Sequence, residues 1–421
     1  MKIKKDLLII GGGSAGLSAA IEAKKNGVDD ILIIEKDDCL GGILNQCIHN
    51  GFGLTLFKKE HTGPEFASVL IDKIKELKIE FWLNTTLLDA SKTKIATVSN
   101  VNGVFEIEAN AIIITTGCYE RNAGHIALPG KRLAGVISAG TAQKYLNIYG
   151  CLPGKRVVIL GSGDIGLIMA RRLKMEGAEV VCVAELMPYS NGLNRNIVQC
   201  LEDFNIPLYL STTVSDVIGK ERVEKVVLSK VDKNFNIAPI PFKEIECDTL
   251  LLSVGLIPYL GSFKNLDFIM GRNKGPEVDQ FNQTSIPGIF ICGNCLHVHD
   301  VVDFVCEESF LSGYSASLYL KGLLNNQNKE KHYINFDNHI SYVVPNFLVD
   351  NNINDVCFKF RVNKPLKNCF IQIYNNKNLI FKVKKIALIP SEMVMIKIKK
   401  DLIFIDEIKP NIEIKIFEEI E

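Results

Sequence analysis

The sequence predicts an α/β protein in which two similar parallel-sheet units are followed by a small β-rich segment. Three observations support this fold class. A strand, a glycine-rich loop, a helix and a second strand occur in that order twice. Strands that suit the first unit reappear after the second, so one unit is inserted into the other. Short apolar runs separated by Asn and Pro occupy the C-terminal part.

The first unit starts close to the N-terminus. The apolar run 7–10 predicts a buried strand, and the loop 11–16 reads Gly-Gly-Gly-Ser-Ala-Gly. A helical pattern continues to about residue 26, and a second apolar strand, 31–34, ends at Glu35. This order of strand, GxGxxG loop, helix, strand and acid is typical of a dinucleotide-binding fold.

The glycines and the acid of this unit each have a physical role. Gly11 permits a tight turn, Gly13 lets the backbone approach a pyrophosphate, and Gly16 lets the helix pack closely on the strand. The helix N-terminus offers free N–H groups to the phosphates. Glu35 can accept hydrogen bonds from a ribose diol. We therefore predict that this unit binds a dinucleotide.

The same pattern occurs a second time. Strand 157–160 leads into the loop 161–166, which reads Gly-Ser-Gly-Asp-Ile-Gly, and after a helical pattern strand 179–184 ends at Glu185. The acid of each unit stands equally far along the chain from the first glycine of its loop. A single GxGxxG is a weak signal, whereas two copies with every part in register are a strong one.

The second acid also favours one nucleotide over the other. Glu185 would repel the 2′-phosphate of NADP, and the following Leu186 and Met187 provide no cation to receive it. We therefore expect NAD at the second unit and consider NADP less suitable.

Three later strands are expected to complete the first fold. They are 112–114, which leads into Thr115-Thr116-Gly117; 249–254, which ends at Gly255; and 286–291, which leads to Gly293 and Asn294 before a helical pattern over 304–320. The predicted domains are residues 1–122 with 248–325, an insert of 123–247, a linker of 326–338, and a β-rich C-terminal domain of 339–421.

These motifs, in this order, resemble the pyridine nucleotide–disulfide oxidoreductase superfamily of flavoproteins, over roughly residues 5 to 325. The segments 41–53, 138–143, 185–190 and 297–300 are similar to one branch. That branch contains NAD/FAD oxidoreductases associated with glycerol-3-phosphate dehydrogenase-like proteins, and the α subunits of sarcosine, proline and opine dehydrogenases. The resemblance implies two Rossmann-like domains, FAD in the first and NAD in the inserted one.

Two sets of site residues follow from the motifs and the resemblance. The candidate cofactor-binding residues are Gly11, Gly13, Ser14, Ala15, Gly16, Glu35, Gly42, Thr116, Gly117, Gly161, Gly163, Asp164, Ile165, Gly166, Glu185, Gly255, Gly293 and Asn294. The candidate catalytic residues are Cys47 and His49, on the loop that relatives place beside the flavin ring. His49 could move a proton near neutral pH, or could be a hydrogen-bonded loop residue.

The redox cysteine pair of the disulfide reductases is absent. Leu44 and His49 occupy the positions that this pair takes after Gly41-Gly42. The remaining CxxC, Cys292 to Cys295, is expected to supply buried packing residues, with a redox couple as the alternative. No spacing typical of a zinc site occurs, so no metal is expected. His297, His299 and Asp300 could form a proton relay or could tether their loop.

Composition limits the partners and the compartment. Lys+Arg and Asp+Glu both number 48, so there is no basic excess of the kind that favours nucleic acid. No apolar run is long enough for a transmembrane helix. Twelve cysteines without a secretory signal favour a reducing, cytoplasmic location.

The predicted function is hydride exchange between NAD(H) and FAD in a subunit that trades electrons with a partner dehydrogenase. The partner's substrate would be a small metabolite such as glycerol 3-phosphate or an amino acid. The alternatives are a self-sufficient NADH oxidase or thioredoxin-reductase-like enzyme, and a structural nucleotide-binding subunit. In the tail, five short strands (356–362, 370–374, 379–383, 394–398 and 412–417) predict a β module. This module could dock a partner or cap the core.

Overall fold

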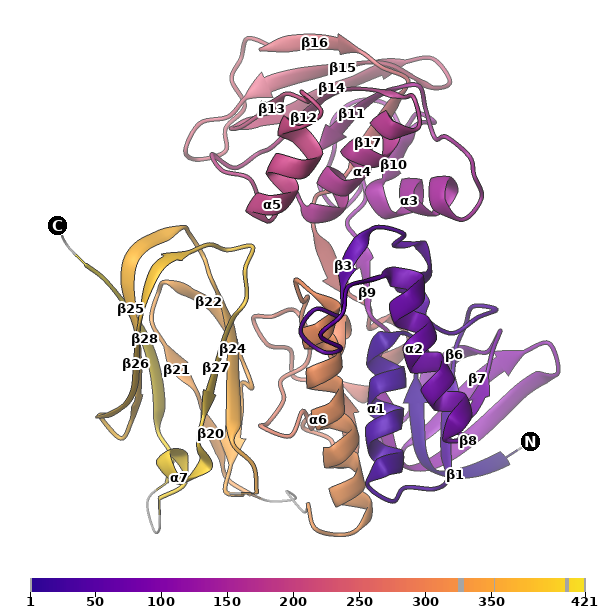
Figure 1. Cartoon of the computed structure of the whole chain (residues 1–421), viewed down its shortest axis with the longest axis vertical. Helices are drawn as coiled ribbons and strands as arrows, with labels where there is room; N and C mark the ends of the chain where they lie inside the picture. Colours follow the sequence, from indigo (N-terminus) through magenta and orange to yellow (C-terminus); the bar gives the residue numbers. More distant parts are fainter. Residues whose placement is uncertain (1, 325–328, 352, 406–408, 420–421) are drawn as a thin grey trace. The chain divides into compact units, whose positions relative to one another are not determined.

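The computed structural model describes residues 2–324, 329–351, 353–405 and 409–419 (Figure 1). The chain forms two compact units, Met1–Cys118 with Pro258–Glu421, and Tyr119–Ile257. The second unit begins before and ends after the predicted insert 123–247. The strand predicted over 249–254 was therefore assigned to the wrong fold: residues 249–252 pair with residues 157–160 in the sheet of the second unit. A short buried apolar run fits either sheet, so its pattern did not distinguish the two units. Among the described residues, no helix combines the length and apolar character needed to cross a membrane.

The first unit is built on a sheet of order β5-β2-β1-β8-β7-β6, with β19 paired to β8. Residues 7–10 of β1 are buried on both sides. Alternate side chains point to opposite faces of the sheet, and each face is covered by a hydrophobic core. Leu7 and Ile9 join one core and Leu8 and Ile10 the other. The parallel strands are β1 (Lys2–Ile10), β2 (Ile31–Ile34), β5 (Glu80–Trp82), β8 (Gly103–Ile114) and β19 (Ile289–Ile291), and β6 (Thr86–Ala90) and β7 (Ile95–Asn100) are antiparallel.

Three helices belong to this fold: α1 (Ser14–Lys25), α2 (Gly63–Glu76) and α6 (Val302–Leu320). Helices α1 and α6 approach closely because small residues meet at their contact. A Cβ on Gly313 of α6 would lie 2.2 Å from the carbonyl oxygen of Ala19 in α1. Helix α2 begins with a capping box in which Thr62 and Glu65 bond each other's backbone N–H.

The second unit repeats this design. Its parallel sheet has the order β10-β17-β11-β12-β13, so β11 lies between its two neighbours as β1 does in the first sheet. The strands are β10 (Val136–Ser138), β11 (Arg156–Leu160), β12 (Glu179–Ala184), β13 (Leu208–Tyr209) and β17 (Thr249–Leu252), with an antiparallel sheet of β14 (Thr212–Gly219), β15 (Val223–Lys230) and β16 (Lys243–Glu246). The helices are α3 (Ala139–Asn147), α4 (Asp164–Met175) and α5 (Asn194–Ile197).

The C-terminal β module, residues 329–419 as far as they are described, has a core of its own. All five predicted strands are confirmed, with β24 and β27 at the predicted bounds. The strands are β20 (Lys331–Tyr333), β21 (Asn335–Phe336), β22 (Ile340–Val344), β23 (Phe347–Val349), β24 (Val356–Val362), β25 (Leu366–Asn375), β26 (Asn378–Leu388), β27 (Val394–Ile398) and β28 (Ile412–Glu418), with the short helix α7 (Lys400–Ile403).

The predicted linker 326–338 differs from the structure. Residues 326–328 lie outside the described residues, but β20 and β21 occupy much of the remainder. Polar composition suggested a linker here, yet Lys331–Tyr333 pairs with β23 and Asn335–Phe336 pairs with β28. Pairing with other strands therefore overrides the local composition; the partner of β20 follows shortly after it, and the partner of β21 lies at the far end of the module.

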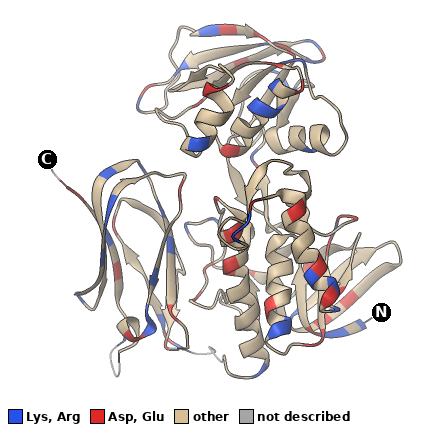
Figure 2. Ribbon diagram, in the orientation of Figure 1, with Lys and Arg blue, Asp and Glu red and all other residues tan. Residues whose placement is uncertain are grey.

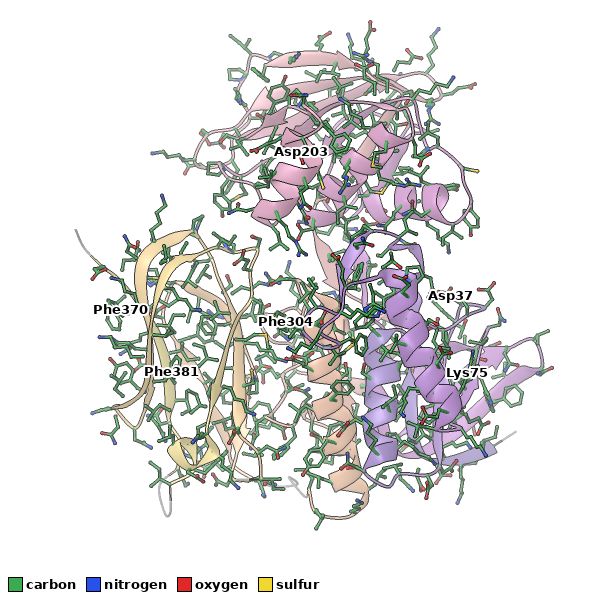
Figure 3. All side chains as sticks on the ribbon, viewed as in Figure 1. Asp37, Lys75, Asp203, Phe304, Phe370 and Phe381 are labelled. Atoms are coloured by element: carbon green, nitrogen blue, oxygen red, sulfur yellow. The ribbon has the colours of Figure 1, made fainter. Side chains whose placement is uncertain are left out.

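Charged groups are mixed over the molecule. Figure 2 shows Lys and Arg interspersed with Asp and Glu on both units. In the module, Phe381 packs against the core, while the ammonium groups of Lys382 and Lys384 lie 4.5 and 5.4 Å from the ring centre of Phe370 (Figure 3). The long lysine stems thus shield an aromatic ring on the polar side of the sheet.

Candidate dinucleotide and flavin sites

The first glycine loop turns the chain from β1 into α1. Gly11 has φ +112°, and a Cβ there would lie 2.5 Å from the carbonyl oxygen of Thr115. A Cβ on Gly16 would lie 1.9 Å from the carbonyl oxygen of Gly11. Gly13 differs, since its φ is −78° and its Cβ would meet nothing nearer than Gly42 Cα at 4.0 Å. The protein's own packing thus explains why residues 11 and 16 are glycines. The space beside Gly13, in contrast, suits a pyrophosphate.

Helix α1 begins at Ser14, so Ser14, Ala15 and Gly16 of the motif form its first turn. Its N-cap Gly13 supplies no side-chain hydrogen bond to the first turn, so the turn is open to an external acceptor. Gly42 follows a left-handed residue, Gly41, and has φ +56° itself. Gly13 and Gly41 form a β-bridge, which brings the loop after β2 alongside the first glycine loop.

Glu35, at the end of β2, is buried and binds its own loop. Its Oε2 accepts a hydrogen bond from the N–H of Gly12 at 2.7 Å, and its Oε1 accepts from the N–H of Asp37 at 2.9 Å. A carboxylate has about four acceptor positions, so capacity remains for a ribose diol. The contact with Gly12 fixes the acid against the turn that would receive the pyrophosphate.

The Thr-Thr-Gly segment continues the same site after β8. Thr115 Oγ1 donates to the carbonyl oxygens of Ile10 and Gly11 at 2.9 Å each. Thr116 Oγ1 donates to the carbonyl oxygen of Tyr259 at 2.7 Å. Gly117 has φ +68°, and no atom within 4 Å would meet a Cβ there. The space at Gly117, like that at Gly13, suits a bound group.

The turn after β19 closes on the first loop. Gly293 has φ +73°, and a Cβ there would lie 3.0 Å from Ala15 Cβ. Its N–H donates to Oε2 of Glu308 at 2.8 Å. Asn294 accepts from the N–H of His299 at 3.0 Å, and its Nδ2 lies 3.7 Å from Cys118 Sγ. The segments predicted to bind FAD therefore converge, although they are far apart in sequence.

Cys47 and His49 follow the short helix η1 (Gly42–Gln46). Burial raises the pKa of the Cys47 thiol to about 12, and Sγ donates to the carbonyl oxygen of Ile43 at 3.3 Å. The thiol is thus protonated at neutral pH and is not a thiolate nucleophile. The His49 ring lies 5.0 Å from that of Phe52. Strand β3 (Asn50–Phe52) and its partner β4 (His61–Thr62) carry this segment.

An acid of helix α6 fixes the loop that follows β3. The buried carboxylate of Asp303 accepts hydrogen bonds from the N–H groups of Gly53, Thr55 and Leu56 at 3.1, 3.0 and 2.7 Å. Because three donors converge on one carboxylate, the loop 53–56, which follows β3, is anchored to the start of α6.

The cysteines do not form a redox pair in the structure. All twelve lie in the described part of the chain, and all are free. Cys292 and Cys295 are fully buried, and burial raises the pKa of each thiol, that of Cys295 to about 12. Cys295 Sγ donates to the carbonyl oxygens of Cys292 and Ile114 at 3.1 and 3.3 Å. Leu44, at a position where disulfide reductases have cysteine, is a core residue.

The second glycine loop reproduces the first. A Cβ on Gly161 would lie 2.1 Å from the carbonyl oxygen of Ser253, and one on Gly166 would lie 2.6 Å from Ser253 Cβ. Ser253 Oγ accepts from the Gly166 N–H at 3.1 Å, so this side chain links the strand end to the first turn of α4. A Cβ on Gly163 would lie 3.2 Å from Ser253 Oγ and 3.6 Å from the Ser253 carbonyl oxygen.

Glu185 binds the second loop as Glu35 binds the first. Its Oε2 accepts from the N–H of Ser162 at 2.8 Å and from Ser162 Oγ at 2.6 Å, while Oε1 accepts from the Met187 N–H at 2.8 Å. Burial, with the nearby Glu185 carboxylate, raises the pKa of Tyr189. Among the described residues, Glu185 forms no ion pair with Lys or Arg.

Three other predicted residues have different roles: Asp164 and Ile165 belong to the second loop, and Gly255 follows the strand 249–252. Asp164 Oδ1 accepts from the Leu193 N–H at 2.9 Å and from Asn196 Nδ2 at 2.6 Å, so it shapes the following loop. Ile165 lies in the first turn of α4 and is half-buried. Gly255 has φ +101°, and its carbonyl oxygen accepts from the Arg121 N–H.

Several site residues were not predicted. Thr115, Ser162 and Ser253 each hold a glycine loop, and the available signal was a small hydroxyl residue beside the strand end or the loop. Glu308 was also missed: α6 also contains Asp303 and the exposed Glu307, so the sequence alone does not single out Glu308 as a buried charge that needs a partner.

Two glycine loops, each with its acid, define a protein that binds two dinucleotides. A family model described as pyridine nucleotide-disulphide oxidoreductase matches residues 5–309, and the chain belongs to this family. It is an FAD-dependent, NAD(P)-linked oxidoreductase, as predicted.

Individual relatives agree with this family. The chain is 28% identical to an NADH oxidase of Methanocaldococcus jannaschii, over 76% of this chain and 69% of that protein. It is 26% identical to the F component of alkyl hydroperoxide reductase from Staphylococcus epidermidis, over 69% of this chain and 54% of that one, so it spans only about half of that relative. The crystal structure of T. acidophilum thioredoxin reductase matches with TM-score 0.60 and 25% identity, over 76% of this chain and 98% of that one.

Proposed function

We propose that the chain transfers hydride between NAD(H) bound at the 161–166 loop and FAD bound at the 11–16 loop. The observation that carries this proposal is the equivalence of the two loops, each with a glycine whose place suits a pyrophosphate and an acid anchored on the loop backbone. When bound, FAD supplies the hydride chemistry. The protein's residues bind, orient and separate the two cofactors.

The nucleotide at the second loop is NAD in this proposal. Glu185 is held rigidly by Ser162 and Met187, so the carboxylate does not turn away from a 2′-phosphate at low cost. The adjacent Leu186 is apolar and exposed. A 2′-phosphate would thus meet a negative charge without a compensating cation.

The electrons are proposed to leave or enter through a partner flavoprotein that acts on a small metabolite, such as glycerol 3-phosphate or an amino acid. The cysteines support this: all twelve are free, and the CxxC pair, Cys292 and Cys295, is fully buried, so no disulfide is present to carry electrons onward. A relative from Agrobacterium tumefaciens, named as one of the subunits of opine oxidase, is 27% identical over 47% of this chain and 40% of that protein.

A second candidate is a self-sufficient NADH oxidase. The M. jannaschii relative with that name supports it, and it matches over most of both chains. In this case the two electrons taken from NADH would reduce oxygen directly, and no second polypeptide would be needed.

One experiment separates these functions. The purified, FAD-loaded chain is mixed with NADH without oxygen, and the flavin absorbance is followed. Bleaching supports hydride transfer, and lack of bleaching with FAD bound contradicts it. Admitting air then distinguishes the candidates: rapid, catalytic oxygen consumption supports the oxidase, whereas slow reoxidation that an isolated partner flavoprotein accelerates supports the role in a larger complex.

A further inference from the structure

The loop 293–301, between β19 and α6, is held by side chains of the C-terminal β module. This loop contains the proposed FAD residues Gly293 and Asn294. The side chains that hold this loop come mainly from β24. One face of β24 packs in the module's core through Val356, Phe358, Phe360 and Val362. Lys359 and Arg361 point to the opposite face, because side chains alternate along a strand.

Lys359 neutralises the acid that holds Gly293. Its Nζ lies 2.6 Å from Oε1 of Glu308, and the other oxygen of Glu308 accepts the Gly293 N–H at 2.8 Å. Glu308 is 1% exposed and Lys359 6%. Burial alone would raise the pKa of Glu308, but Lys359, with His299 and His297, holds it well below its usual range. A buried carboxylate without this ammonium would be an uncompensated charge.

A second ion pair fixes the other end of the loop. Arg361 bonds Asp300 and also donates to the carbonyl oxygen of Val298 at 3.0 Å. The second oxygen of Asp300 accepts from the Met393 N–H at 2.6 Å. Both pairs join the flavin fold to the module, and both belong to the compact unit that contains β1 and α6.

The cluster around Glu308 also contains two histidines. His297 Nε2 lies 2.8 Å and His299 Nε2 3.5 Å from Glu308 Oε1, and the three ligand atoms lie within 4.8 Å of one another. Such a set could hold a divalent cation. Here, however, the Lys359 ammonium contacts the same oxygen, Oε1 of Glu308. It therefore supplies the positive charge that a metal ion would supply.

We propose that Lys359 and Arg361 are positioning residues of the flavin site, through which the C-terminal β module holds the Gly293–Asn294 turn in the conformation that binds FAD. The module is then a required part of the flavin site rather than a detachable docking domain. The inference rests on the proposed function, since it takes Gly293 and Asn294 as FAD contacts.

The test is made on the full chain with Lys359→Met. Met keeps most of the side-chain volume and removes the charge. We expect the dissociation constant of FAD to rise by at least about tenfold, and the visible circular dichroism of the bound flavin to change. The control is Lys397→Met, on β27 of the same module, whose side chain is 70% exposed. This control should bind FAD as the natural protein does.

A charge-coupled double variant excludes a general loss of structure. Glu308→Gln combined with Lys359→Met removes both charges but keeps an oxygen for the Gly293 N–H. The double variant should bind FAD at least about fivefold more tightly than Lys359→Met does, because no unpaired charge remains buried. If Lys359→Met alone fails to fold, the double variant must still fold and bind FAD.

Three results would overturn the inference. They are unchanged FAD affinity in Lys359→Met, no recovery in the double variant, and a stoichiometric divalent metal in the natural protein whose chelation releases FAD. Failure of the proposed function gives a different result, since the natural protein would then hold FAD but not accept hydride from NADH.

Discussion

Glu35 and Glu185 make equivalent hydrogen bonds in the two nucleotide folds. Each uses Oε2 to accept the N–H of the second residue of its glycine loop, Gly12 at 2.7 Å and Ser162 at 2.8 Å. Each uses Oε1 to accept the N–H of the residue two positions later in the chain, Asp37 for Glu35 and Met187 for Glu185. The repeated sequence pattern is therefore a repeated geometry, in which each acid is preorganised by the loop it serves.

This equivalence predicts separable effects for a matched pair of variants. Glu35→Gln should weaken FAD binding by about 1–2 kcal/mol, because the amide replaces one acceptor by a donor that faces an N–H. It should leave the KM for NADH unchanged in the chains that retain FAD. Glu185→Gln should raise the KM for NADH and leave FAD binding unchanged. Flavin fluorescence measures FAD binding, and steady-state kinetics measures the KM for NADH. Loss of FAD from Glu185→Gln, or a raised KM alone from Glu35→Gln, contradicts the assignment.

The glycines of one loop should also differ in their effects. Gly16→Ala places a methyl group 1.9 Å from a carbonyl oxygen, so it should lower the free energy of unfolding by about 1–3 kcal/mol. Gly13→Ala meets no atom closer than 4.0 Å, so the FAD-free protein should unfold as the natural one does.

The ligand then distinguishes the two glycine variants. Gly13→Ala should bind FAD at least about tenfold more weakly, since the methyl group enters the space assigned to the pyrophosphate. Denaturant titration and fluorescence titration give the two quantities. Strong destabilisation of the FAD-free Gly13→Ala protein would show that its glycine serves packing instead.

The free cysteines predict the electron capacity of the chain. Full anaerobic reduction with dithionite should take two electrons per FAD, because no disulfide is present to accept a second pair. The double variant Cys292→Ser with Cys295→Ser should be reduced by NADH at a similar rate if it folds. An uptake of four electrons by the natural protein, falling to two in this variant, would identify a redox couple at these buried thiols.

Acid should destabilise the protein through His297. Burial lowers the pKa of His297 to about 4 from 6.5, so the unfolded chain binds a proton at higher pH than the folded one does. Stability is therefore lost as the pH falls from 6.5 to about 4, by up to about 3 kcal/mol. Glu308, whose folded pKa lies well below 4.5, adds a further loss below pH 4.5.

The variant His297→Gln isolates this contribution. Its free energy of unfolding should fall less than that of the natural protein between pH 6.5 and 4, as measured by urea titration at each pH. Parallel curves for the two proteins would mean that His297 is already protonated in the folded state.

The sequence was sufficient for the glycine loops, for the strands that flank them and for the longer strands of the C-terminal module. Residues 31–34, 179–184 and 356–362 are strands at the predicted bounds because apolar patterns at these places are bounded by loops or acids. The short strands β20 and β21 were missed, because their polar composition is that of a linker and only their pairing with β23 and β28 makes them strands. Lys359 has the alternating pattern of a solvent-facing residue, and only the contact with Glu308, distant in sequence, explains its burial.

The central claim is that this chain moves hydride between NAD(H) and its own FAD. Its most direct test is anaerobic stopped-flow mixing of the FAD-loaded chain with NADH or NADPH, with flavin absorbance as the signal. The account predicts complete bleaching by one equivalent of NADH, and at least about tenfold slower bleaching by NADPH at subsaturating concentration because of Glu185. A flavin that stays oxidised with NADH bound would contradict it.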